Sequence, residues 1–166
     1  MDTAKLQSLL ISFEGRIGPN SLMQGTVVVF VLAVILQLLA IAVPFIGILG
    51  LALLYPLFCI YAKRFHDGGK PAIWTLAVLG GVFIGGMVLA AILTPLVVGD
   101  VFAAAMRGEN VTGMTIRIKT FLLGVVNAGI LYFGASFIVN QFVKGEAAAN
   151  AYGEPPADAS SINPLS

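Results

Sequence analysis

A run of 38 residues from Gly25 to Ala62 carries no charged side chain. One membrane-spanning helix needs about 20 apolar residues, so this run is too long for one span and suits two. Pro44 and Gly47 lie near its middle, where proline stops a helix and glycine permits a tight turn. We expect spans at 23–43 and 46–63, joined as a hairpin, with a kink at Pro56 in the second.

The composition of the whole chain also indicates a lipid environment. Of the 166 residues, 58% are hydrophobic and 10% are charged, whereas soluble domains carry about 25% charged residues. A water-soluble fold of this size could not bury so much apolar surface. The net charge of +1 gives no basic footprint, so we expect no nucleic-acid partner.

Two further apolar segments predict spans at 71–98 and 120–143, with Pro71 at the first-turn position that tolerates proline. Between them, residues 99–119 hold five charged side chains, and 101–106 are expected to form a short helix on the membrane surface. The sequence therefore predicts an all-α membrane protein whose residues 20–144 form a four-span transmembrane bundle.

The two ends of the chain are more polar. Residues 1–19 are expected to form an amphipathic interfacial helix and a Gly-Arg turn, because Leu6, Leu9, Leu10 and Phe13 recur at helical spacing. Residues 145–166 form a polar C-terminal tail whose composition cannot bury enough apolar area to fold alone. We expect this tail to be mobile or bound by a partner.

The distribution of cations predicts the orientation. Four spans place both termini and the 63–70 loop on one side, with six Lys and Arg residues against three on the other. Cytoplasmic loops carry the excess of cations, so both termini are expected in the cytoplasm. The six are Lys5, Arg16, Lys63, Arg64, Lys70 and Lys144, and the three are Arg107, Arg117 and Lys119.

Tyr61 to Trp74 holds the only His and the only Trp. Its Lys63-Arg64-Phe65-His66-Asp67, with Trp74 further on, resembles the Arg-Arg-Leu-His-Asp…Trp-Trp signature of the domain-of-unknown-function 805 family. Phe13-Glu14-Gly15-Arg16-Ile17 and Asn150-Ala151-Tyr152-Gly153-Glu154-Pro155-Pro156 are similar to its opening and closing motifs. The resemblance, with several departures, implies a divergent member of a family of small bacterial inner-membrane proteins that has no established reaction.

The family frame suggests that all three motifs meet on the cytoplasmic face. We expect Asp67 to pair with Arg16 or Arg64, and Tyr152 to pack over the 63–70 loop. Such contacts would fix the N-terminal helix and the tail onto the bundle. We call the motif residues the latch: Gly15, Arg16, Lys63, Arg64, His66, Asp67, Gly68, Trp74, Asn150, Tyr152, Gly153 and Pro156.

The latch also admits a simpler structural interpretation. Asp67 would form a turn with Gly68 and Gly69, Lys63 and Arg64 would meet anionic headgroups at a helix end, and Trp74 would join the interfacial aromatic belt. His66 and Asp67 are adjacent, point about 100° apart on a helix, and lack the third ligand that a metal needs. We expect no catalytic residue, metal or cofactor.

Within the spans, Gln37 and Asn127 are the main polar groups and are expected to form interhelical hydrogen bonds. No ionisable residue accompanies them, which argues against proton-coupled transport. Glycines should thin the helices and allow close packing, inside the bundle or against another protein. These packing glycines are Gly81, Gly85, Gly86, Gly124, Gly129 and Gly134.

Three functions remain open at this point. The first is a non-catalytic structural or accessory subunit that binds another membrane protein or itself. The second is a small channel or carrier for an uncharged or lipid-like solute, lined by Gln37 and Asn127. The third, an intramembrane enzyme, would require His66 and Asp67 to face a pocket. A continuous cavity joining Gln37 and Asn127 would favour the carrier.

Overall fold

The computed structural model describes residues 3–109 and 113–157. Over these residues the chain is all-α, and the only β pairing there is an isolated bridge between Asn150 and Gly153. The helices are α1 Thr3–Ile11, α2 Pro19–Ala42, the 3₁₀-helix η1 Pro44–Leu53, α3 Leu54–Asp67, α4 Trp74–Met106 and α5 Met114–Phe142.

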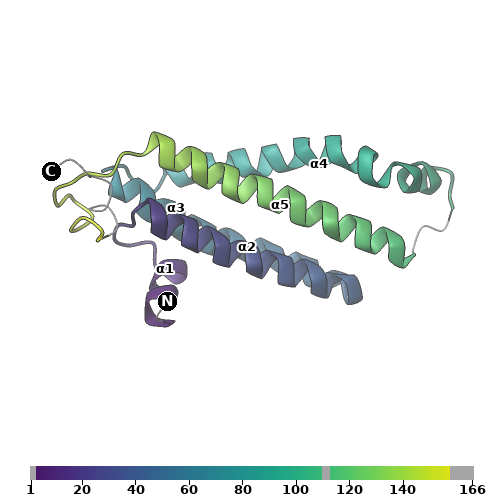
Figure 1. The fold of residues 1–166 in the computed structure, drawn as a ribbon, viewed down its shortest axis with the longest axis horizontal. Helices are drawn as coiled ribbons and strands as arrows, with labels where there is room; N and C mark the ends of the chain where they lie inside the picture. Colours follow the sequence, from purple (N-terminus) through teal and green to yellow (C-terminus); the bar gives the residue numbers. More distant parts are fainter. Residues whose placement is uncertain (1–2, 110–112, 158–166) are drawn as a thin grey trace.

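Four segments are long and apolar enough to cross a membrane: Pro19–Ala42, Phe45–Asp67, Trp74–Val101 and Ile116–Phe142. α2 packs against α5, and α4 packs against α5 and α3 (Figure 1). The four-helix part of the prediction is therefore confirmed by length and composition. α1 runs across the direction of α2 and α5 (Figure 1), as an interfacial helix would, but its membrane position stays a prediction.

The second span differs from the expected single α-helix at 46–63. Its first ten residues, Pro44–Leu53, wind as a 3₁₀-helix, and the α-helix begins only at Leu54. Pro56 therefore lies in the first turn of α3, directly after the 3₁₀-helix that precedes it. The kink expected at Pro56 stays a prediction, and the observed change of winding comes before the proline.

The other spans also differ at their ends from the predicted bounds. α2 begins at Pro19 rather than residue 23 and ends at Ala42, one residue before the predicted 43. α4 starts at Trp74, so Pro71 precedes the helix. It continues into the expected 99–119 connection as far as Met106, so residues 101–106 belong to α4 rather than to a separate short helix. α5 begins at Met114, six residues before the predicted 120, and ends at Phe142. Helical hydrogen bonding thus extends past the apolar residues that define a span by hydropathy.

The densest packing lies at one end of the bundle, where α1, the turn after α3 and the segment after α5 meet (Figure 1). Leu22, Leu57, Ile60, Tyr61 and Val143 are at most 1% exposed there. By contrast, Thr75 and Val98 are the buried residues among the described side chains of α4. The structure therefore places many of its fully buried side chains where the three sequence motifs converge.

The start of the C-terminal tail packs against the bundle instead of extending from it. The Glu146 backbone N–H donates to the Asp67 carbonyl at 2.8 Å, and Asn150 and Gly153 exchange backbone hydrogen bonds at 3.1 Å. The expectation that the tail needs a partner is therefore wrong for 145–157, which we call the tail segment. Residues 158–166 lie outside the described part.

Candidate functional site

Asp67 is the centre of a buried charge cluster with Arg16 and Arg64. Its Oδ1 lies 3.0 Å from Arg16 Nη2, and its Oδ2 pairs with Arg64 Nη1. The three side chains are at most 3% exposed. Two cations and one anion leave a formal excess of one positive charge, so this site needs further acceptors.

Backbone carbonyls of the tail segment supply those acceptors to Arg16. Its guanidinium donates to the carbonyl oxygens of Ala148 at 2.8 Å and Gly153 at 3.1 Å, and to that of Glu146. A guanidinium has five N–H donors, and Arg16 directs them at Asp67 and at the tail. The tail segment is ordered because it completes the hydrogen bonding of a buried cation.

Arg64 joins α3 to the end of α5. Its Nε donates to Asn140 Oδ1 at 2.9 Å and its Nη2 to the Val143 carbonyl at 2.6 Å. Asn140 in turn donates to the Pro19 carbonyl at 3.3 Å, which reaches the start of α2. The cluster therefore connects the two ends of the chain to three of the spans.

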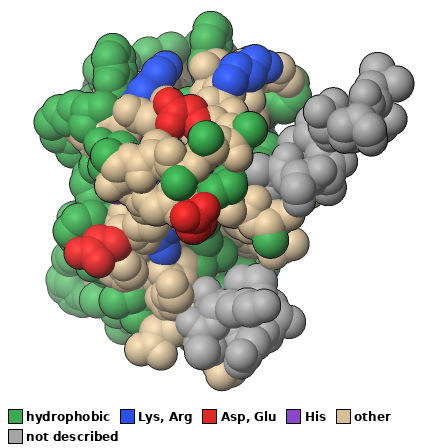
Figure 2. Space-filling view, turned by 90° about the vertical axis from the view of Figure 1, so that its left-hand side faces the viewer, with side chains coloured by type: hydrophobic (Ala, Val, Ile, Leu, Met, Phe, Trp, Pro, Cys, Tyr) green, Lys and Arg blue, Asp and Glu red, His purple; other side chains and the backbone are tan. Residues whose placement is uncertain are grey.

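Lys63 is buried as well, and it does not meet anionic headgroups as expected. It is 3% exposed, and its Nζ donates to the carbonyls of Ser8 and, at 3.3 Å, of Leu9. These carbonyls end α1, where intrahelical partners are missing and a cation is favourable. Among the described side chains, Lys70 and Lys144 are exposed at this end instead, and Figure 2 shows charged side chains gathered on this face.

His66 and Asp67 face different neighbours, as their helical spacing predicts. The His66 ring stacks on Tyr152 with centroids 3.9 Å apart and planes 1° apart, and its Nδ1 lies 3.2 Å from the Gly15 carbonyl. Asn150 Nδ2 donates to the His66 carbonyl at 3.0 Å. The expected packing of Tyr152 over the 63–70 loop and both possible Asp67 pairs are therefore present.

The turn after α3 uses backbone hydrogen bonds rather than the Asp67 side chain. Gly69 N donates to the His66 carbonyl at 3.0 Å and Lys70 N to that of Phe65 at 2.9 Å, which is a Schellman cap. Gly69 has a positive φ of 67°, which explains the glycine. A Cβ on Gly68 would lie 2.7 Å from Val143 Cγ1, so this turn touches the end of α5.

Trp74 and Pro156 contribute less to the latch. The Trp74 side chain is 54% exposed at the start of the third candidate span, a placement that suits an aromatic belt. Pro156 is half-buried in the tail segment, and no side-chain role is evident for it.

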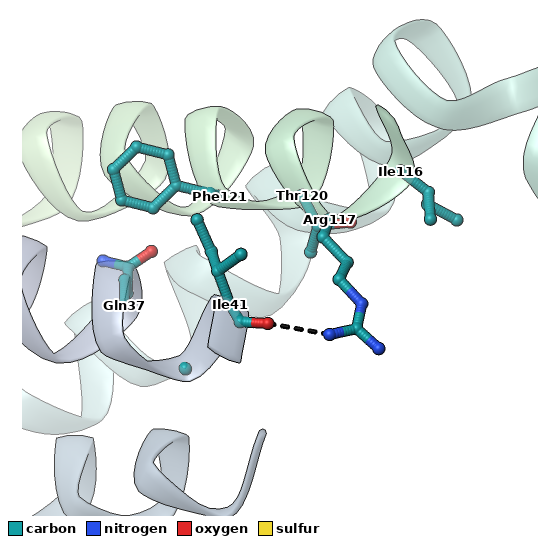
Figure 3. A pocket seen from close by; sticks show the side chains of 7 residues that line it. Gln37, Ile41, Ile116, Arg117, Thr120 and Phe121 are labelled. Atoms are coloured by element: carbon teal, nitrogen blue, oxygen red, sulfur yellow. Dashed lines mark hydrogen bonds between the residues drawn. The ribbon is translucent and has the colours of Figure 1, made fainter. Parts of the chain in front are cut away.

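Gln37 and Asn127 do not form the expected interhelical hydrogen bonds. Among the described residues the Gln37 side chain has no hydrogen-bond partner, and it lines a pocket of about 340 Å³ between the end of α2 and the start of α5. The buried Asn127 Oδ1 also has no partner there and is not among that pocket's lining residues. Arg117 of α5 also lines this pocket, and its Nη1 donates to the Ile41 carbonyl of α2 at 2.8 Å (Figure 3).

The packing glycines divide into two groups. Gly85 and Gly86 face Leu131, Gly129 faces Phe30, and Gly124 accommodates the Gln37 side chain, which agrees with helix packing. Gly81 and Gly134 have nothing within 4 Å of an added Cβ. They instead line an apolar groove of about 390 Å³ between α4 and α5, so close packing within the chain is wrong for these two.

A polar chain inside the bundle was not singled out from the sequence. Thr26 donates to the Leu22 carbonyl at 2.9 Å, its Oγ1 lies 2.7 Å from Ser136 Oγ, and Ser136 Oγ lies 3.1 Å from the Tyr61 hydroxyl. Because Thr26 donates its one hydroxyl proton to Leu22, Ser136 donates to Thr26. The Tyr61 hydroxyl directs its one proton between Ser136 Oγ and the Tyr132 carbonyl, which lies 3.4 Å away. Isolated Ser, Thr and Tyr residues carry no spacing signal that distinguishes such a chain.

The arrangement does not assemble the catalytic site considered above. His66 lines a pocket of about 440 Å³, whereas Asp67 lines a separate one of about 280 Å³ with Arg64 and Asn140. No group of three or more His, Cys, Asp or Glu residues that could hold a metal ion occurs within 3–109 and 113–157. The geometry instead serves to hold segments together.

No protein-family model, curated protein or solved structure matches this chain. The resemblance to the domain-of-unknown-function 805 family consequently stays a prediction that rests on the three motifs.

Proposed function

We propose that this chain is a non-catalytic accessory or structural subunit of a bacterial inner-membrane complex, with both termini in the cytoplasm and a divergent relationship to the domain-of-unknown-function 805 family. The proposal rests on one observation: the buried charged residues at this end of the bundle use their hydrogen bonds for contacts within the chain. Arg16 and Arg64 are buried, and each pairs with the buried Asp67 and donates to backbone carbonyls.

The surface available to a partner is the groove between α4 and α5. It combines Gly81 and Gly134, which leave space for a close backbone approach, with apolar side chains such as Val78 and Ile138. Small residues at a helix surface favour association with another transmembrane helix. A helix of a second membrane protein, or of a second copy, would fill this groove.

Gentle-detergent purification followed by native mass spectrometry tests the proposal. We expect a stoichiometric partner subunit or a dimer, and we expect Gly81→Leu to release it by filling the groove. Gly99→Leu is the matched control, because Gly99 also lies on α4 with nothing within 4 Å of an added Cβ but does not line the groove. A solitary monomer in every mild detergent would contradict the proposal.

The carrier alternative receives less support. Gln37 lines a pocket at one end of the bundle that does not include Asn127, so the two polar groups do not mark a common path. A solute-flux assay in liposomes would test it, with Gln37→Leu as the variant. Saturable transport by the wild-type protein that is lost in the variant would support the carrier function.

A further inference from the structure

A pocket of about 440 Å³ lies where the Gly-Arg turn, the end of α3 and the tail segment meet. Seven residues line it, six from these three regions and Ala72 from the turn between α3 and α4. Glu14 is the single charged residue among them, so the described lining includes no Lys or Arg. The lining residues are Phe13, Glu14, Gly15, His66, Ala72, Ala151 and Tyr152.

His66 presents a hydrogen-bond acceptor to this pocket. Its Nδ1 lies 3.2 Å from the Gly15 carbonyl, which can only accept, so Nδ1 carries the proton and Nε2 of the neutral ring has a lone pair. Nε2 has no partner among the described residues. His66 lines the pocket, and its Nε2 is not among the enclosed unpartnered atoms of the described residues, which are Thr75 Oγ1 and Asn127 Oδ1.

Glu14 presents a second acceptor. Its residue is exposed, and its backbone N–H donates to Ser12 Oγ at 3.2 Å, which fixes the turn. Its carboxylate has no hydrogen-bond or ion-pair partner in the part of the chain that the structure describes. An ionised carboxylate accepts but does not donate, so the pocket has two side-chain acceptors and a negative charge.

Two aromatic rings complete the lining. Tyr152 is held by its stack on His66, and Phe13 packs edge-on against Phe58 with centroids 6.4 Å apart. The face of an aromatic ring attracts a cation. A cation that lies on the face of either ring would be stabilised in addition to its attraction to Glu14, whereas a phosphate would not.

We propose that this pocket binds a primary ammonium group, which donates N–H bonds to Glu14 and to His66 Nε2 while it lies against Phe13 and Tyr152. A quaternary ammonium has no N–H and would satisfy the charge but not the two acceptors. The ligand is an aminophospholipid headgroup or a free alkylamine. Ala72 in the lining is two residues before the exposed Trp74, which places the pocket near the depth of lipid headgroups.

Lipid competition on the full chain tests the site. The protein in phosphatidylcholine nanodiscs is exchanged with phosphatidylethanolamine, and bound lipid is counted by native mass spectrometry. We expect phosphatidylethanolamine to be retained about tenfold over phosphatidylcholine, the value of one charge-assisted hydrogen bond. If free ethanolamine displaces it, a soluble amine suffices as ligand; if ethanolamine has no effect, the lipid is the ligand. Equal retention of the two lipids with no effect of ethanolamine overturns the proposal.

A matched pair of variants locates the binding. Glu14→Gln removes the negative charge and keeps the size of the side chain, which is exposed and takes no part in the charge cluster. We expect this variant to lose most of the tenfold preference for phosphatidylethanolamine. Glu154→Gln removes an exposed carboxylate that is not among the lining residues and should keep the preference. An undiminished preference in Glu14→Gln would show that another surface selects the lipid and that the proposal is wrong.

Discussion

The carboxylate of Asp67 lies 3.0 Å from the guanidinium of Arg16, and the two side chains are 0% and 1% exposed. These residues are 51 positions apart and belong to the turn after α1 and the last residue of α3. The pair therefore fixes the N-terminal segment to the end of the second candidate span.

Asp67→Ala is expected to destabilise the protein by about 3–5 kcal/mol, because it leaves two buried guanidinium groups without their anion. Arg16→Ala should have a smaller effect, since Asp67 keeps Arg64. The double variant should be less destabilised than the sum of the single variants by about 1 kcal/mol or more. Thermal unfolding in one detergent measures all three; additive losses would show that the pair does not act as a unit.

Gly15→Ala is expected to cost about 1–2 kcal/mol, because Gly15 has a φ of +88° that residues with a Cβ disfavour. The added Cβ meets nothing within 4 Å, so the cost is conformational rather than steric. Gly99→Ala, in a helix and also without neighbours, serves as control and should not destabilise. Equal unfolding temperatures for the two variants would contradict the positive φ of Gly15.

The same substitution at two buried threonines should have opposite effects. Thr26→Val breaks the hydrogen bonds to Leu22 and Ser136 and should cost about 1 kcal/mol. Thr75 Oγ1 is buried without a partner among the described residues, so Thr75→Val removes an unsatisfied hydroxyl and should stabilise by about 1 kcal/mol. Denaturation of the two variants side by side provides the measurement, and destabilisation by Thr75→Val would reveal a partner for that hydroxyl.

Cysteine labelling in intact cells tests the predicted orientation. Cys59 is fully buried, so Cys59→Ala provides a background in which Lys70→Cys and Glu109→Cys report on the two ends. Glu109 forms an exposed ion pair with Arg107, and such a pair contributes little to stability. We expect an impermeant maleimide to reach position 109 and not position 70. The reverse pattern would place the termini outside the cytoplasm.

Hydropathy was sufficient to find four apolar helices, because length and the absence of charge determine a span. It could not find their ends, since α5 includes the charged Arg117 and Lys119 and α4 includes Asp100. Backbone hydrogen bonding continues through such residues, and Arg117 even satisfies a terminal carbonyl of α2. The positions of helix ends thus depend on contacts with other elements, and the hydrophobic periodicity of the sequence gives no information about these contacts.

The pairing of Asp67 with arginine could be expected from the order of the three motifs, but the ordering of the tail segment could not. Its small polar residues bury little surface and contribute mainly backbone carbonyls to Arg16. Composition describes side chains, and here the main chain makes the contact. Asn127 shows the opposite failure, since a residue type that usually bonds across helices leaves its Oδ1 without a partner among the described residues.

The 3₁₀ winding of Pro44–Leu53 gives the second span a length that its residue count does not imply. A 3₁₀-helix rises about 2.0 Å per residue and an α-helix about 1.5 Å. The ten residues of η1 thus reach about 5 Å further than the same residues would in α form. If η1 changed between the 3₁₀ and α forms, the second span would lengthen or shorten to match bilayers of different thickness. The end of the span at Asp67 would stay in place.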